Sequence, residues 1–529
     1  MQNILSLTEL NSDDFETEKF EYTKFRNYIK DGFFTAKHKK YGDVVVFYTI
    51  DKNPIFLARY EQVKINISFD LYQKLLSKLF AKQLTKNSVF SRKQKAKTIY
   101  FNGQKIYYKF IYLVSAILSL LIIMPSLFWL WYASNIIIRI VFMISGCRKK
   151  IEHKIGNINL PTFTILIPMY KEIDVLRQSI DSIVAIDYPS HLLDIKIVLE
   201  EDDRQMIDMI KTIDLPYFIT VIIVPFSVPQ NKPKALNFAF LFARGEYLAI
   251  YDAEDIPDIL QLKKVVSQFA NSPSKTIALQ GSLCYYNKNY NLITNLCSLE
   301  YSIWFDILLP GVKKFGGFIP LGGTTNHCKT SAVESIGSWD AFNVTEDAEL
   351  SCRMVKKGFE VDYLNSKTEE ESVISVKAWL NQRTRWIKGY IVTLVAYFQY
   401  FNSKKVSFID SLNFNNLCFF VVINSLLMSF LILIYVAKWL VDIETLYTDN
   451  IFVIICMACF ILLTIFYIFY CFFKLNMSLW CSIRTGIVFP FYCVGQTIAC
   501  LRAIYQIYNN QEYTWEKTEH GLCLNKNKI

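Results

Sequence analysis

In Tyr247-Leu-Ala-Ile-Tyr-Asp-Ala-Glu-Asp255 a short apolar run ends directly in acidic residues, and this pattern indicates the class of fold. Four further apolar runs of similar length lie in the same region, at residues 162–167, 195–199, 218–224 and 276–279, and polar stretches of helix length separate them. Short buried runs that alternate with amphipathic helices are typical of a parallel sheet covered by helices on both faces. The sequence therefore predicts an α/β fold with a doubly wound sheet.

Acidic residues follow two of these runs where each strand is expected to stop. Glu200-Glu201-Asp202-Asp203 follows the run at 195–199, and Asp252-Ala-Glu254-Asp255 follows the run at 247–251. Ligands of parallel sheets bind beyond the carboxyl ends of the strands. Asp252 and Glu254 occupy alternate positions and point to the same side, which predicts a Mg²⁺ or Mn²⁺ site completed by phosphate oxygens. The alternative is a solvated acidic turn that caps a helix beginning near Pro257.

Residues near these metal candidates suit the rest of a nucleotide. The carboxylates of Glu200, Glu201 and Asp202 can accept hydrogen bonds from a pyrimidine N–H group or a ribose hydroxyl, although a plain polar loop would have the same composition. Lys232 and Lys234 are expected at the start of a helix, where a phosphate binds well. A basic first turn that binds no ligand is the alternative for the two lysines.

Thr345-Glu346-Asp347 precedes a helix-like stretch and supplies a candidate general base. Transfer of a sugar with inversion requires a carboxylate that takes the proton of the attacking hydroxyl, and Asp347 is suited to that role. In isolation the same three residues also match an ordinary helix start with a capping box and acidic first turn.

Gln382, Arg385 and Trp386 lie close together in Asn381-Gln-Arg-Thr-Arg-Trp-Ile-Lys-Gly389. An amide, a guanidinium and an indole on one short amphipathic stretch suit a sugar acceptor beside a pyrophosphate. The alternative is an interfacial helix whose charged and aromatic side chains lie in a lipid headgroup layer.

The composition indicates a membrane protein, since 52% of the 529 residues are hydrophobic and 16% are aromatic. Residues 107–146 predict two spans that turn near Trp131 to Asn135, and 416–437 and 451–473 are each long enough to span. Residues 483–508 are polar enough to favour an interfacial or re-entrant segment. The net charge of +10 is concentrated beside apolar segments, which indicates cytoplasmic flanks rather than nucleic-acid binding.

Together these observations predict the following organisation: a cytosolic α+β domain (1–106), a transmembrane hairpin (107–146), an α/β domain (155–375), an interfacial amphipathic helix (376–405), C-terminal transmembrane or interfacial helices (410–508) and a cytosolic tail (509–529). The thirteen cysteines are scattered, many of them in apolar runs, and are expected to be reduced small hydrophobes.

The motifs, taken in order, resemble a known family. The chain is similar to membrane-embedded family-2 glycosyltransferases of the cellulose-synthase-like and hyaluronan-synthase-like group, over roughly residues 160–400. The motifs that carry the resemblance are Leu199 to Asp203, Asp252 to Glu254, Thr345 to Asp347 and Gln382 to Trp386. Three further stretches resemble one bacterial branch: Pro168 to Glu172, Pro320 to His327 and Trp515 to Gly521.

The resemblance implies a GT-A-like nucleotide-sugar-binding domain and a role for each motif. Asp347 would be the base, and Asp252 and Glu254 would hold Mg²⁺ or Mn²⁺. The residues implied at the nucleotide sugar are Glu200, Glu201, Asp202, Lys234 and Asp255. The residues implied at the acceptor and the diphosphate are Glu346, Gln382, Arg385 and Trp386. Two departures concern Glu254, where many relatives have Asp, and Glu200-Glu201, which replaces a more usual Asp-Asp pair.

The sequence thus predicts an inverting, metal-dependent glycosyltransferase of the inner or plasma membrane with a cytosolic catalytic domain. Its donor would be a UDP- or GDP-sugar, and its acceptor a growing polysaccharide or another glycan. Addition of a single sugar to a lipid or short glycan is the alternative within the enzyme class. A catalytically silent nucleotide-binding scaffold and a membrane conduit are the alternatives outside it.

Overall fold

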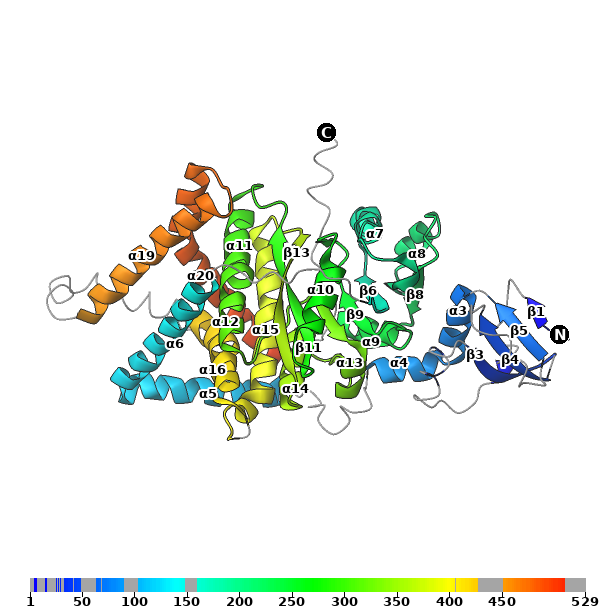
Figure 1. Cartoon of the computed structure of the whole chain (residues 1–529). Helices are drawn as coiled ribbons and strands as arrows, with labels where there is room; N and C mark the ends of the chain where they lie inside the picture. Colours follow the sequence, from blue (N-terminus) through cyan, green and yellow to red (C-terminus); the bar gives the residue numbers. More distant parts are fainter. Residues whose placement is uncertain are drawn as a thin grey trace.

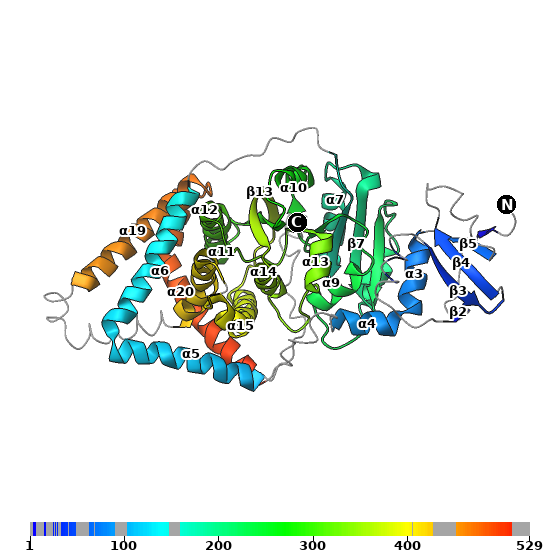
Figure 2. The same ribbon diagram turned by 60° about the horizontal axis from the view of Figure 1, so that its bottom comes forward.

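The computed structural model describes residues 103–147, 159–404, 406–426 and 451–509, together with shorter segments between residues 4 and 89. An α/β domain occupies the middle of the molecule, and a small N-terminal sheet lies at one end (Figure 1). Long helices form the opposite end, as both views show (Figure 2). These helices are α5 (Gly103–Ile123), α6 (Pro125–Gly146), α19 (Ile451–Phe473) and α20 (Leu479–Tyr508).

The central sheet has eight strands in the order β10-β13-β11-β12-β9-β6-β7-β8. Their bounds are β6 (Phe163–Met169), β7 (Leu193–Glu200), β8 (Ile219–Val224), β9 (Tyr247–Ile250), β10 (Ile256–Pro257), β11 (Thr276–Tyr285), β12 (Asn326–Lys329) and β13 (Glu360–Glu370). All five predicted runs are strands of this sheet, so the α/β class is confirmed.

The sheet is mixed: the five predicted runs all point in the same direction, as expected, but two strands outside these runs, β10 and β12, are antiparallel to their neighbours. Strands β6, β7, β8 and β9 pair in parallel, but β12 runs antiparallel between β9 and β11, and β10 runs antiparallel to β13. The sequence of β12, Asn-His-Cys-Lys, is short and polar, and β13 alternates buried and exposed residues. Neither therefore shows the continuous apolar run that reveals a central parallel strand.

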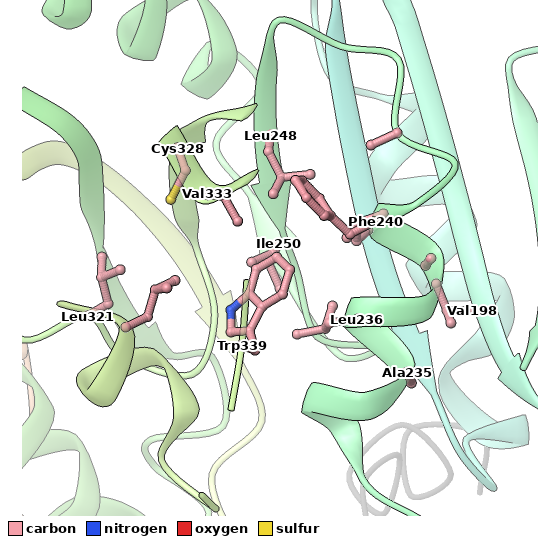
Figure 3. Close-up of a cluster of buried hydrophobic side chains, with 14 of the residues drawn as sticks. Val198, Ala235, Leu236, Phe240, Leu248, Ile250, Leu321, Cys328, Val333 and Trp339 are labelled. Carbon is pink, nitrogen blue, oxygen red and sulfur yellow. The ribbon is translucent and has the colours of Figure 1, made fainter. Parts of the chain in front are cut away.

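Helices cover both faces of the sheet, as the alternating pattern predicts. One face packs against α7 (Leu176–Val184), α8 (Arg204–Ile210) and α10 (Gln261–Ala270). The other packs against α9 (Lys232–Phe240), α13 (Thr330–Ile336) and α14 (Glu346–Lys356). Figure 3 shows this second core, where the buried indole of Trp339 lies beside Ile250 of β9 and Leu236 of α9. Successive strand residues face opposite sides, so both faces contribute apolar contacts to stability.

The N-terminal segments form a five-stranded sheet with the order β1-β5-β4-β3-β2. Its strands are β1 (Ile4–Ser6), β2 (Phe15–Glu16), β3 (Phe33–His38), β4 (Gly42–Tyr48) and β5 (Val63–Ile67). The predicted helix at 71–84 is divided into α3 (Phe69–Leu79) and α4 (Ala81–Val89). Helix α4 packs on α9, and the Ser88 carbonyl accepts a hydrogen bond of 2.8 Å from Asn237 Nδ2.

The hairpin predicted for 107–146 consists of α5 and α6, but its turn lies at Met124 and not near Trp131 to Asn135. Pro125 begins α6, where the missing N–H of proline costs no helical hydrogen bond. Ser134 and Asn135, which look like turn residues, instead bond the carbonyl of Trp131 within the helix. Helix α19 has the same bounds as the predicted 451–473 span.

One stretch of the described residues, Leu292–Phe315, is both long and apolar enough to cross a membrane, and 61% of its most apolar part is buried. It comprises α11 (Leu292–Ser302), a π-helical segment (Ile303–Leu308) and α12 (Leu309–Phe315). The two parts of α20, Leu479–Phe489 and Val494–Tyr508, are bent by 48° and pass the same criterion together. Residues 427–437 of the predicted 416–437 span lie outside the described residues. The same is true of the loop at 438–450 and of residues 510–529 in the predicted tail.

Candidate active site

Strands β6, β7 and β9 are parallel, so their carboxyl ends meet at one edge of the sheet, and the acidic clusters lie there. The Asp252 backbone N–H, just after β9, donates to Asp255 Oδ2 at 2.8 Å. Thr324 Oγ1 also donates to Asp255 Oδ2, which anchors the neighbouring loop. Asp255 is buried, Pro257 lies in β10, and α10 begins only at Gln261. The alternative of a solvated turn capping a helix at Pro257 was therefore wrong.

Lys232 is the cation at the centre of this edge. Its Nζ lies 2.5 Å from Asp252 Oδ1 and 2.5 Å from the Gly323 carbonyl oxygen. Burial by itself lowers the pKa of Lys232, but the carboxylates of Asp252, Asp347 and Glu346 outweigh it and raise that pKa. The lysine is therefore charged, pairs with Asp252 and is stabilised by the charges of Asp347 and Glu346.

Glu346 and Asp347 begin helix α14 and are both buried. Thr345 makes no side-chain hydrogen bond to the helix start among the described residues, so the capping-box alternative was wrong. Asn326 Nδ2 donates to Asp347 Oδ1 at 3.2 Å. Burial raises the pKa of Asp347 well above its usual range, the Glu346 charge raises it further, and Lys232 opposes both. A carboxylate with a raised pKa is a stronger base once it is deprotonated.

Helix α15 (Val376–Phe401) carries the Gln/Arg/Trp cluster and packs closely on the start of α14. A Cβ on Gly389 would lie 2.4 Å from Thr345 Oγ1, so this contact requires glycine. Burial raises the pKa of Glu346, and the charges of Lys232 and Arg385 lower it. Gln382 Oε1 is buried and has no hydrogen-bond partner among the described residues.

Trp379, Arg383 and Lys388 of this segment are buried inside the protein, whereas Arg385 and Trp386 are partly exposed, and the location of the helix at a membrane interface stays a prediction. Trp386 is half-buried and stacks on Tyr301 of α11, with ring centroids 6.1 Å apart and planes inclined by 26°. The Tyr301 ring in turn lies 4.3 Å from the Tyr285 ring at the end of β11. Trp386 of α15 is thus connected, through Tyr301, to the carboxyl end of strand β11.

Glu370, the last residue of β13, is a further carboxylate at this edge that sequence reasoning missed. Burial raises its pKa well above the usual range, and Asp255, Glu254 and Asp252 raise it further. Glu370 Oε1 and Asp255 Oδ1 are buried without hydrogen-bond partners among the described residues. Within that part of the chain no three His, Cys, Asp or Glu side chains form a group that could hold a metal by themselves.

The predicted nucleotide residues divide into a buried pair and an exposed group. Glu200 and Lys234 form a fully buried ion pair of 2.7 Å, and burial raises the pKa of Glu200 to about 7 although Lys234 opposes the shift. Asp202 is exposed and accepts hydrogen bonds from Tyr170 Oη at 3.1 Å and Gln230 Nε2 at 2.6 Å. The lysine that reaches the acidic centre is thus Lys232, while Lys234 fixes Glu200.

Glu201 is exposed and accepts a hydrogen bond of 3.1 Å from the Phe226 backbone N–H. Asp203 caps helix α8, accepting from the Met206 N–H at 3.3 Å, and therefore has a structural role. In this cluster, Asp202 is the exposed carboxylate bonded to side chains of two other segments.

The structure brings Lys232 into contact with Asp252, and the charges of Glu346 and Asp347 also act on this lysine, although the sequence separates these residues by up to 115 positions. Sequence reasoning singled out Lys232 without assigning it to this centre. It noted the Pro320 to His327 loop only by resemblance, yet this loop supplies Gly323 to Lys232. Glu370 carried no distinguishing signal, because it lies in the acidic run Glu369-Glu-Glu371.

Comparison with known families gives a match to the model described as "Glycosyltransferase like family 2" over residues 161–389. The curated "Probable glycosyltransferase YdaM" of Bacillus subtilis (strain 168) is 28% identical over 275 residues, which cover 51% of this chain and 65% of that protein. "Glucomannan 4-beta-mannosyltransferase 7" of Arabidopsis thaliana is 26% identical over 242 residues, which cover 44% of this chain and 43% of that protein. The matches therefore span less than two thirds of either relative.

Among solved structures, the mannosyltransferase PcManGT from Pyrobaculum calidifontis, in complex with GDP-Man and Mn²⁺, aligns with a TM-score of 0.47 and 14% sequence identity. The alignment covers 77% of this chain and 100% of that chain.

Proposed function

We propose that residues 161–389, a glycosyltransferase family 2-like domain, transfer a sugar from a nucleotide-sugar donor to a glycan acceptor with inversion at the anomeric carbon. The observation that carries this proposal is the ion pair of 2.5 Å between Lys232 and Asp252 at the carboxyl ends of the parallel strands, where the charges of Glu346 and Asp347 also act on the lysine. A structural role does not require four charged groups from three separate segments, two of them buried and two partly buried, at the ligand-binding edge of a sheet. A pocket that displaces an anionic leaving group does require them.

The chemistry is one displacement. The acceptor hydroxyl oxygen forms a bond to the anomeric carbon while the bond from that carbon to the diphosphate oxygen breaks, and its electron pair leaves with the nucleoside diphosphate. Asp347 takes the hydroxyl proton, and Asn326, which donates to Asp347 Oδ1, fixes the orientation of the carboxylate. Lys232 and Arg385 supply positive charge near the leaving group. No covalent enzyme intermediate is needed.

The acidic edge fits a divalent cation in part. Asp252 would hold Mg²⁺ or Mn²⁺, with Glu254 beside it, and the unpartnered Asp255 Oδ1 and Glu370 Oε1 are buried oxygens that a nearby cation would stabilise. Three protein ligands are not required, because Mg²⁺ sites of this kind use one or two carboxylates and substrate phosphates. When bound, the cation would neutralise charge on the departing diphosphate.

On the nucleotide side we assign Asp202 to the base or the ribose, because its exposed carboxylate is the member of the cluster best placed to exchange its present partners for a ligand. Glu200 and Lys234 form a buried ion pair that holds this part of the site in place. Gln382, Arg385 and Trp386 are assigned to the acceptor end and the diphosphate. The donor class is a UDP- or GDP-sugar, and a mannosyl donor agrees with the mannosyltransferase names among the sequence relatives.

The exposed apolar surface supports a membrane location. Large apolar side chains are exposed on each long helix at one end of the molecule, including Tyr112 (74%), Leu130 (68%), Leu462 (65%) and Trp480 (81%). Such a contiguous end is expected to contact lipid rather than water. We therefore propose that α5, α6, α19 and α20 embed the protein in the inner or plasma membrane, with the sugar-transferring domain on the cytoplasmic side and repeated additions building a polysaccharide.

Incubation of the purified, detergent-solubilised chain with labelled UDP- and GDP-sugars and Mg²⁺ or Mn²⁺ tests the proposal. We expect release of nucleoside diphosphate and a labelled glycan. The variant Asp347→Asn should lose at least about 10²-fold in transfer while retaining nucleotide binding. Sizing the product distinguishes a polymer from single-sugar addition. Absence of turnover with every donor, or full activity of Asp347→Asn, would contradict the proposal.

A further inference from the structure

Glu300 of α11 is the centre of a polar network that the proposed chemistry does not use. Its Oε2 lies 2.7 Å from Arg383 Nη2, and its Oε1 accepts a hydrogen bond of 3.1 Å from Arg383 Nη1. The same carboxylate accepts hydrogen bonds from two residues of α20, Tyr492 Oη at 2.6 Å and Gln496 Nε2 at 3.2 Å. One carboxylate therefore joins α11, α15 and α20.

Arg383 connects this network to Trp386, one of the residues assigned to the acceptor end. Its guanidinium carbon lies 4.3 Å from the centroid of the Trp386 ring, which is close cation–π contact. The Arg383 side chain is 7% exposed, so the contact is largely desolvated and gains strength from that. The planar guanidinium both pairs with Glu300 in a two-point arrangement and stacks on the indole, which lysine cannot reproduce.

The packing around the network leaves little freedom. Trp379 Nε1 donates to Tyr492 Oη at 2.6 Å, so the hydroxyl that donates to Glu300 is itself fixed from α15. A Cβ on Gly495 would lie 2.8 Å from the Trp379 ring, which shows how closely α20 crosses α15. Tyr301, which follows Glu300 in α11, stacks on Trp386. The indole is therefore held from α11 and through Arg383.

We infer that Arg383, held by Glu300 and α20, is a positioning residue that sets the orientation of Trp386 for the acceptor sugar. The inference rests on the proposed function, since it deepens the acceptor site of the same reaction. Arg383 does not touch the reacting atoms. Its effect is expected on acceptor binding, while the donor centre around Lys232 should remain intact.

Two variants remove different parts of the arrangement. Arg383→Lys keeps a positive charge for Glu300 but loses the flat face over the indole, and Glu300→Gln keeps the size of the side chain but loses the charge that fixes Arg383. Arg502→Lys is the matched control, because Arg502 Nη1 also joins α20 to α15, through Asn381 Oδ1 at 2.6 Å, without contacting Trp386.

The measurements are calorimetric binding of mannotetraose and cellotetraose, steady-state transfer, and donor hydrolysis without acceptor. Arg383→Lys and Glu300→Gln should weaken binding of the oligosaccharide that wild type binds, and raise the acceptor KM, by about tenfold, with donor hydrolysis close to wild type. The melting temperature should stay close to wild type for Arg383→Lys and fall for Glu300→Gln, which leaves the buried Arg383 charge without its partner. Arg502→Lys should match wild type. Adding Trp386→Phe to Arg383→Lys should cost little beyond the larger single effect.

Unchanged acceptor binding in both variants, equal losses in acceptor binding and donor hydrolysis, or no binding of either probe by wild type would each overturn the inference. Failure of the proposed function is a separate result, namely that wild type turns over no nucleotide sugar. The binding experiment does not depend on turnover and so distinguishes the two.

Discussion

Gly389→Ala is the change whose effect can best be worked out from the structure. The added Cβ would lie 2.4, 2.5 and 2.8 Å from Thr345 Oγ1, Cγ2 and Cβ. To reach the ordinary contact range that begins at 3.4 Å, these distances must lengthen by about 0.6 to 1.0 Å. Thr345 directly precedes Glu346 and Asp347, so the displacement is transmitted to the proposed base.

The two energetic effects of Gly389→Ala oppose each other. Alanine gains about 1 kcal/mol over glycine in a helix interior, whereas overpacking costs about 1–3 kcal/mol. The net loss of stability should be no more than about 2 kcal/mol. Because a misplacement of about 1 Å at a catalytic group can cost about 10²-fold in rate, we expect kcat to fall about 10- to 100-fold with only a small change in melting temperature.

The assay is steady-state transfer from labelled donor, with thermal unfolding of the same samples. Thr345→Ala combined with Gly389→Ala removes two of the three clashing atoms and should recover part of the lost kcat, while Thr345→Ala alone should change it little. If Gly389→Ala transfers sugar at the wild-type rate, the packing of α15 on α14 does not position the base and the reasoning is refuted.

Three further predictions concern the charges of the centre. Lys232→Met should reduce kcat/KM by about 10²-fold or more, because it removes the cation whose charge interacts with three carboxylates. Lys232→Arg should recover part of the loss. Equal activity of the wild type and Lys232→Met would exclude a role of Lys232 in stabilising the leaving group. Glu346→Gln should move the acidic limb of the pH profile of kcat/KM to lower pH. The Glu346 charge raises the pKa of Asp347, which must be deprotonated to act. An acidic limb that stays at the same pH or moves to higher pH would contradict this. Chelation with EDTA should abolish transfer, and Mn²⁺ or Mg²⁺ should restore it. Asp252→Asn should need a higher metal concentration for half-maximal activity. Full transfer in the presence of EDTA would show that the reaction does not depend on a metal ion.

Local patterns in the sequence predicted much of the fold. Each of the five apolar runs is a strand, and α9 and α14 begin where the lysine pair and Thr345 predicted. These features depend on residues near one another in the chain, namely buried apolar runs and residues at helix starts, so the sequence is sufficient to predict them. The parallel pairing of β6, β7 and β9 then follows, because crossover helices connect them.

Only the tertiary structure decided which charged groups share an environment. Lys232 and Lys234 lie in the same helix start, yet Lys232 faces Asp252 and Lys234 is buried against Glu200. In the same way, Arg383 and Arg385 are two positions apart, but Arg383 is buried and pairs with Glu300, whereas Arg385 is partly exposed. The side chains of each pair leave their helix in different directions, and the partner of each is fixed by the packing of distant segments. That packing minimises the free energy of the whole chain, so no local pattern records it.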